Sequence, residues 1–166
     1  MPQVASPACP DQHEQMPDLD AGHVERRNWM AVLARAGGEE IAARLAEVPD
    51  LPPWRLLRGP ESGLVMVRGR AGGGGTPFNL GEMTVTRCSV RLEAGQIGHA
   101  YVAGRDARQA ELAAAADALL QDPALRAVVA EVVIAPLAMH QAERRAVTAA
   151  KAAATRVQFF ALRTMR

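Results

Sequence analysis

The chain has 166 residues, of which 49% are hydrophobic, 22% are charged and only 4% are aromatic. Its 19 Lys and Arg residues against 18 Asp and Glu residues give a formal net charge of +1, so no strong field favours a nucleic acid or a membrane surface as partner. This length suits one globular domain, and the scarcity of aromatic side chains predicts an interior built mainly from Leu, Val, Ile, Met and Ala.

The N-terminal segment differs in composition from the rest of the chain. Residues 1–20 carry little apolar surface and prolines at positions 2, 7, 10 and 17, which predicts a disordered extension before a single domain over residues 23–166. They lack the features of a secretory signal, and no apolar run reaches the roughly 18 residues of a membrane span. Cys9 and Cys88 are the only cysteines and have no metal-ligand spacing. A cytoplasmic protein without a membrane or metal site is expected.

Two helices are predicted next. Apolar side chains recur at helical spacing from His23 until Gly37, and again from Glu39 to Val48, where Pro49 ends the pattern. The two segments predict an N-terminal helix pair.

Two strands are predicted on either side of a turn at Gly59 and Pro60. The first covers residues 54–58, and the second covers residues 64–70. Leu64 to Val67 form a continuous apolar run, which is typical of an interior strand covered on both faces. The second segment is therefore predicted to lie inside a sheet.

A run of four glycines, Gly72, Gly73, Gly74 and Gly75, follows this strand. Such a run lets a ligand approach backbone N–H groups closely. It matches neither the GxxxxGK[ST] phosphate loop nor a GxGxxG turn that opens a helix. A flexible connection between two strands is the other interpretation.

Residues 84–92 and 96–103 predict an antiparallel hairpin that turns at Ala94 and Gly95. A two-residue loop places six side chains on its core side: Cys88, Val90, Leu92, Ile97, His99 and Tyr101. Arg87 and Arg91 then project from the opposite side. Alanine is unfavourable at the first position of such a turn, so a slip by one residue, which exchanges the faces, stays open.

Arginine carries nearly all of the positive charge, because Lys151 is the only lysine. Its planar guanidinium suits bidentate contact with phosphate or carboxylate, although solvated surface positions explain exposed arginines equally well. The positions that fit phosphate binding or partner contact are Arg70, Gly72, Gly73, Gly74, Gly75, Arg87, Arg91 and Arg105.

The last third of the chain is predicted to be mainly helical. Asp106 caps a helix that continues to about Gln121, and a long helix runs from Leu137 to about Thr155. Residues 132–135 fit a strand or a helix, and residues 157–162 predict a C-terminal strand. The fold class is α+β, with a mostly antiparallel sheet and a central hairpin, packed by the N-terminal helix pair and the C-terminal helices.

No catalytic residue is predicted. The histidines have no metal-ligand spacing, and the chain contains no GxSxG sequence. Cys88 reads as a buried thiol unless a neighbouring base or cation lowers its pKa. An alanine-rich helix gains little from burial in its own domain, so burial against a partner subunit is one way to make up the difference.

Several stretches taken together resemble one family, over residues 26 to about 163. They are RxxWM from Arg26, PESGLV at 60–65, RAGGGGTPFNLGEMTVTRCSVRL at 70–92, GRD at 104–106, DAL at 117–119, Pro136-Leu137 and RVQFFALR at 156–163. The family is the PhnG subunit of the bacterial carbon-phosphorus lyase core complex. The ending departs from that family's Val-Asp-Phe-Phe-Thr pattern at Gln158 and Ala161, which affects details of a C-terminal contact.

The resemblance implies a cytoplasmic role in organic phosphonate catabolism, in a complex with PhnH, PhnI and PhnJ. With PhnH, PhnI and PhnL, this family supports attack of methylphosphonate on the ribose C1 of MgATP, which releases adenine and forms α-D-ribose 1-methylphosphonate 5-triphosphate. The nucleosidase chemistry belongs chiefly to PhnI. This implies an accessory subunit that binds no cofactor alone, with MgATP as a substrate of the complex. The residues themselves leave open a free-standing nucleotide-binding enzyme that uses the glycine run, and a generic scaffold.

Overall fold

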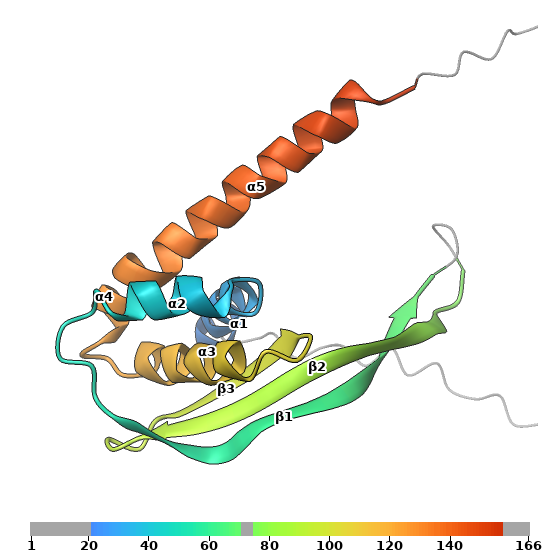
Figure 1. Ribbon diagram of the computed structural model, residues 1–166. Helices are drawn as coiled ribbons and strands as arrows, with labels where there is room; N and C mark the ends of the chain where they lie inside the picture. The colour runs from blue at the N-terminus through green and yellow to red at the C-terminus, as the bar shows by residue number, and fades with distance from the viewer. Residues whose placement is uncertain (1–20, 71–74, 158–166) are drawn as a thin grey trace, which may run out of the picture.

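The protein is built on a three-stranded antiparallel sheet with helices stacked over one face (Figure 1). The structure, a computed structural model, describes residues 21–70 and 75–157. The strands are β1 (Trp54–Gly69), β2 (Phe78–Leu92) and β3 (Ile97–Ala103), in the order β1-β2-β3. The predicted α+β class with an antiparallel sheet is confirmed.

The helices cover one face of the sheet in layers. They are α1 (Ala21–Leu33), α2 (Gly38–Leu45), α3 (Ala107–Leu120), α4 (Arg126–Val129), the π-helical turn η1 (Ala130–Ile134) and α5 (Ala135–Ala154). Helix α3 lies directly on the sheet, and α1 and α2 pack against α3 (Figure 1). Residues 132–135, for which the sequence fitted a strand or a helix, lie in η1 and at the start of α5 and are helical. The extension predicted over residues 1–20 lies outside the described residues, as does the strand predicted over residues 157–162 apart from Val157.

Helix α3 approaches the sheet closely because its side chains are small. Six of its alanines are at most 2% exposed: Ala110, Ala113, Ala114, Ala115, Ala116 and Ala118. Gly98 of β3 lies directly beneath the helix, where a Cβ atom would overlap the carbonyl oxygen of Ala114 and come within 2.6 Å of the backbone nitrogen of Ala118. These alanines are thus buried within the chain itself, and no partner is needed to cover them.

A single carboxylate, Asp117, ties α3 to α1 and to β3. Asp117 is fully buried and accepts hydrogen bonds from Arg26 Nη2 at 2.7 Å, Trp29 Nε1 at 2.8 Å and the backbone nitrogen of His99 at 2.9 Å. Arg26 Nε adds a further bond at 3.2 Å. The His99 N–H points outward from the edge strand β3. Because it is bonded to Asp117, it is not free to pair with another strand.

The hairpin between β2 and β3 has a loop of three residues, Glu93 to Gly95, where two were predicted. Leu92 N donates to Gln96 O at 3.0 Å, and Gly95 adopts a φ of 102°. Glycine at the left-handed position is typical of a three-residue hairpin loop. The pairing is therefore shifted by one residue from the prediction.

The shift reverses the faces of β3 and leaves those of β2 as predicted. Ser89 now pairs with His99, and Arg87 pairs with Tyr101. Cys88, Val90 and Leu92 face the core as expected, but their neighbours on β3 are Gly98, Ala100 and Val102. The prediction that Ile97, His99 and Tyr101 line the core is wrong, and the slip that the turn sequence left open has occurred.

Strands β1 and β2 continue well beyond β3 and form a projecting two-stranded ribbon (Figure 1). We call this ribbon, residues 64–69 with 78–84, the arm. Seven of its apolar side chains are exposed: Leu64, Val65, Met66, Val67, Phe78, Leu80 and Met83. The prediction of separate strands at residues 54–58 and 64–70, with the second in the sheet interior, is wrong, because β1 is one long strand at the sheet edge.

Helix α5 also projects from the body (Figure 1). Only Leu137 and Gln141 of its residues are buried, while Met139 and Val147 are exposed. Within the part of the chain that the structure describes, no helix has both the length and the apolar character needed to cross a membrane.

Candidate functional site

The face of the sheet opposite α3 carries most of the charged side chains of the strands, and we call it the open face. Its central part contains Arg55 and Arg58 of β1 and Arg87 and Arg91 of β2, with Glu61 of β1 as the acidic residue among them. Four positive groups against one negative group leave this area with a formal charge of +3. The open face therefore favours an anion.

Glu61 holds two of these arginines. One of its carboxylate oxygens lies 3.1 Å from Arg58 Nε and 3.1 Å from Arg87 Nη2. The hydrogen bonds from Arg58 and then from Arg87 lower the pKa of Glu61. All three side chains are exposed, so solvent and salt screen the attraction, and the cluster positions the guanidinium groups more than it stabilises the fold.

Arg91 has the least satisfied surroundings on the open face. It lies opposite Arg55 on one side and Ile97 on the other. Among the residues described, neither arginine lies within 4.0 Å of a carboxylate oxygen, and the Arg91 Nε is buried without an acceptor. Like charges directly opposite each other are unfavourable. An anion between Arg55 and Arg91 would relieve both defects.

Ser89 and His99 form a second polar pair on this face. Ser89 Oγ and His99 Nδ1 are 2.8 Å apart, which is the distance expected between a nucleophile and its base. In residues 21–70 and 75–157 no carboxylate orients the other ring nitrogen, and the pair is exposed. It therefore lacks the third group and the enclosed site that acyl-transfer chemistry requires.

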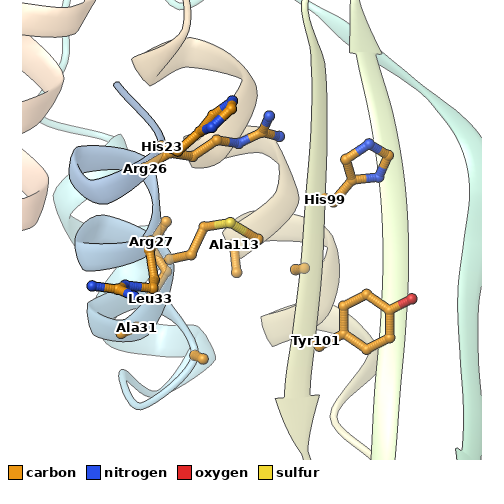
Figure 2. Close-up of a pocket in the computed structure, with 11 residues that line it drawn as sticks. His23, Arg26, Arg27, Ala31, Leu33, His99, Tyr101 and Ala113 are labelled. Atoms are coloured by element: carbon orange, nitrogen blue, oxygen red, sulfur yellow. The ribbon is translucent and has the colours of Figure 1, made fainter. Parts of the chain in front are cut away.

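A pocket of about 390 Å³ lies between α1 and β3 (Figure 2). Met30, Leu33 and Ala113 make its wall mainly apolar. His99 and Tyr101 stand at its border and point away from α1, toward the open face (Figure 2). The pocket is thus an apolar slot between α1 and β3. Two arginines, Arg26 and Arg27, stand at its rim, and Arg26 is held by Asp117.

The predicted site residues do not gather at one place. Arg87 and Arg91 share the open face, whereas Arg70 follows the far end of β1 and lies nine residues beyond Glu61, or roughly 30 Å along the strand. Gly75 lies near the same far end of the arm, and Arg105 follows the turn after β3. Gly72, Gly73 and Gly74 lie outside the described residues.

Sequence reasoning missed the part of the open face that comes from β1. Arg55 and Arg58 meet Arg91 and Arg87 only because β1 pairs with β2 over its full length. A short strand over residues 54–58 was predicted from the sequence. The partner strand was not, because the predicted turn at Gly59 is a bulge within a continuous strand.

Cys88 is a structural thiol. It is 2% exposed, and its Sγ donates to the carbonyl oxygen of Arg58 at 3.4 Å. Burial, with a smaller contribution from the charge of Glu111, raises the pKa of Cys88. A raised pKa disfavours the thiolate, so the nucleophile alternative has no support.

Comparison with known proteins agrees with the distribution of the motifs. The family described as "Phosphonate metabolism protein PhnG" matches residues 24–164. The chain is 48% identical over 143 residues to "Alpha-D-ribose 1-methylphosphonate 5-triphosphate synthase subunit PhnG" of Rhizobium meliloti (strain 1021), which covers 86% of this chain and 91% of that relative. Arg26, Trp29 and Asp117, which come from two of the recognised motifs, meet in one hydrogen-bonded cluster. The chain belongs to the PhnG family of phosphonate metabolism proteins.

Proposed function

We propose that this chain is a non-catalytic subunit of a cytoplasmic ribose 1-methylphosphonate 5-triphosphate synthase complex. With PhnH, PhnI and PhnL it supports transfer of the ribose 5-triphosphate part of MgATP to methylphosphonate. An oxygen of methylphosphonate bonds to the ribose C1, the bond from C1 to adenine breaks, and adenine leaves. PhnJ joins the same core complex and acts later. The chain supplies binding surfaces and binds no cofactor alone.

The exposed apolar arm is the observation that carries this proposal. Leu64 is 63% exposed and Leu80 is 60% exposed, and the apolar side chains occupy both strands of the ribbon. A lone two-stranded ribbon is marginally stable in water, and a large exposed apolar surface marks a protein interaction site. We therefore assign the arm to the contact with PhnI.

A double substitution in the arm tests this assignment. Leu64→Glu with Leu80→Glu places two charges on the apolar surface, and each desolvated carboxylate opposes burial in an interface. Because both leucines are exposed, the fold should persist. We expect the variant to elute separately from PhnI in size-exclusion chromatography at micromolar concentration, where the unsubstituted chain co-elutes with it.

The matched control makes the same change on α5. Met139 and Val147 are 64% and 54% exposed, so Met139→Glu with Val147→Glu adds equal charge at similar exposure. This variant should still co-elute. Co-elution of the arm variant would contradict the role of the arm, and separate elution of the unsubstituted chain would contradict membership of the complex.

The open face supplies the second part of the proposal, an anion contact at Arg91. The Nε of Arg91 has no hydrogen-bond acceptor among the described residues, and Arg55 opposite it carries the same charge. Both features favour binding of an anion at Arg91, either the triphosphate or a carboxylate. Arg91→Ala should lower ATP-dependent adenine release about tenfold, since a hydrogen bond to a charged group contributes roughly 1.5–3 kcal/mol. Adenine is measured by chromatography with all partners present.

Arg108→Ala is the control for this measurement. Arg108 is exposed at the start of α3 and approaches Glu39 only at 3.8 Å, so its loss removes one charge away from the open face. Turnover should stay unchanged. If Arg91→Ala assembles normally and also releases adenine at the unsubstituted rate, Arg91 is a surface residue without a role in the reaction.

A further inference from the structure

A second basic surface lies between the end of α1 and one side of α5. This α1/α5 groove has a volume of about 750 Å³. It is lined by Arg35, Gln141, Arg144, Arg145, Thr148 and Ala149. The small side chains of the last two residues leave room for a polypeptide segment against the helix.

The three arginines of the groove have no acidic partner in the part of the chain that the structure describes. Arg44, Arg58, Arg87, Arg108 and Arg126 each lie within 4.0 Å of a carboxylate oxygen, but no such contact involves Arg35, Arg144 or Arg145. Unpaired charges at this density favour a ligand with several negative groups.

Gln141 indicates what else the ligand must carry. It is 9% exposed, its Nε2 donates to Val32 O at 2.9 Å, and its Oε1 lacks a donor. A buried acceptor without a partner is costly. The groove therefore calls for carboxylates together with an N–H donor, and an acidic polypeptide segment has both.

We propose that the α1/α5 groove binds residues 1–20 of the same chain, which we call the leader. The leader contains Asp11, Glu14, Asp18 and Asp20 and has no Lys or Arg. It precedes the family match, which begins at residue 24, so this contact goes beyond the role proposed for the matched domain.

Chain length decides which acidic residues reach the groove. The leader joins α1 at Ala21, whereas the groove lies at the other end of this helix of 13 residues, about 20 Å away. Glu14, seven residues before Ala21, reaches up to roughly 24 Å, and Asp11 reaches up to roughly 34 Å. Asp18 reaches only about 10 Å. Asp11 and Glu14 are thus the residues that pair with the arginines, at the high effective concentration that a tether provides.

The other basic surfaces fit the leader less well. On the open face, Arg58 and Arg87 already share Glu61, which leaves two arginines, Arg55 and Arg91, without an acidic partner in this cluster. That face also lies on the far side of the sheet from the helices and from the start of α1 (Figure 1). At the pocket between α1 and β3, Arg26 is bound by Asp117 and the wall is mainly apolar. In the α1/α5 groove, by contrast, three arginines without an acidic partner among the described residues lie with Gln141, whose Oε1 is buried without a donor.

The distance between the leader and α5 tests the proposal in the full chain. Cys9 provides a thiol within the leader, while Cys88 is 2% exposed and its raised pKa, caused by burial, keeps it unreactive. Val147→Cys adds a second thiol, 54% exposed and outside the groove lining. Nitroxide labels on Cys9 and on this new thiol report their separation by double electron-electron resonance. We expect one narrow, short-distance component, which is lost in 1 M salt, where charges are screened beyond about 3 Å.

Two triple variants give the comparison. Arg35→Gln, Arg144→Gln and Arg145→Gln together should abolish the narrow component. Arg55→Gln, Arg68→Gln and Arg70→Gln together remove the same charge from exposed positions on β1 and just after this strand. This variant should retain the narrow component. A broad distribution in the unsubstituted chain, or a narrow one in the groove variant, would overturn the proposal. A narrow component between separately labelled chains would assign the groove to the leader of a second copy and would also overturn it.

Discussion

Replacing Gly98 by alanine should lower the free energy of unfolding by about 3 kcal/mol or more, at the upper end of the cost of overpacking a core. The added methyl group would overlap the carbonyl oxygen of Ala114 and lie 2.6 Å from the backbone nitrogen and 2.9 Å from the Cβ of Ala118. These atoms belong to the α3 backbone or are fixed directly to it. No flexible side chain can move aside, so the whole helix must shift off the sheet.

Urea unfolding followed by circular dichroism measures this loss. Gly63→Ala is the matched control, because Gly63 also lies in a strand but a Cβ there meets nothing within 4 Å. Its effect should stay within about 0.5 kcal/mol. A Gly98→Ala midpoint equal to that of the control would mean that α3 does not lie on β3 as closely as the structure places it.

The hairpin shows which features local sequence determines. Alternation identified both strands and placed Cys88, Val90 and Leu92 correctly in the core. The register depended on whether the loop holds two or three residues, and Gly95 suits either length. What selects the three-residue loop is tertiary, because only Gly98 can lie beneath the backbone of α3. The sequences of β2 and β3 alone do not show that α3 lies above Gly98.

The arm shows a different limit of sequence reasoning. The run from Leu64 to Val67 correctly indicated apolar surface of the kind that is normally covered, but these side chains are 36–63% exposed in this chain. Hydrophobic patterning reports that a surface is apolar and does not report which polypeptide covers it. The proposed contact with PhnI reconciles the pattern with the exposure.

The arginine site was half predicted. Arg87 and Arg91 were placed on one face of β2, which the structure bears out geometrically, because β2 kept its predicted orientation. Arg55 and Glu61, which set the electrostatics around them, come from a strand whose pairing was not inferred. Cross-strand neighbours depend on register. Two bulges lie between Leu56 and Glu61, so the register cannot be found by counting residues along the sequence.

Asp117 is the most consequential residue whose role the sequence did not reveal. Asp117 stands in the middle of the apolar stretch LAAAADALL, and its donors lie 91 residues away at Arg26 and 18 residues away at His99. A buried carboxylate is tolerated only where several donors converge on it. That convergence requires the complete fold.

Asp117→Ala should therefore lower the free energy of unfolding by about 3–5 kcal/mol, the usual cost of removing one partner from a buried ion pair. The substitution leaves the Trp29 indole N–H and the His99 backbone N–H buried without acceptors, and it removes the counter-charge of Arg26. Loss of the His99 bond also uncovers the outer edge of β3, so we expect the variant to aggregate sooner during urea unfolding.

Comparison with Arg26→Ala separates the ion pair from the buried hydrogen bonds. The Arg26 side chain is 32% exposed, and its removal leaves Asp117 with its bonds to Trp29 and His99, so this change should cost only about 1–2 kcal/mol. Asp122→Ala, which loses a single bond to the Ala124 backbone, should cost about 1 kcal/mol. If Asp117→Ala were no more harmful than Asp122→Ala, the bonds that converge on this carboxylate would not hold α1 to the sheet.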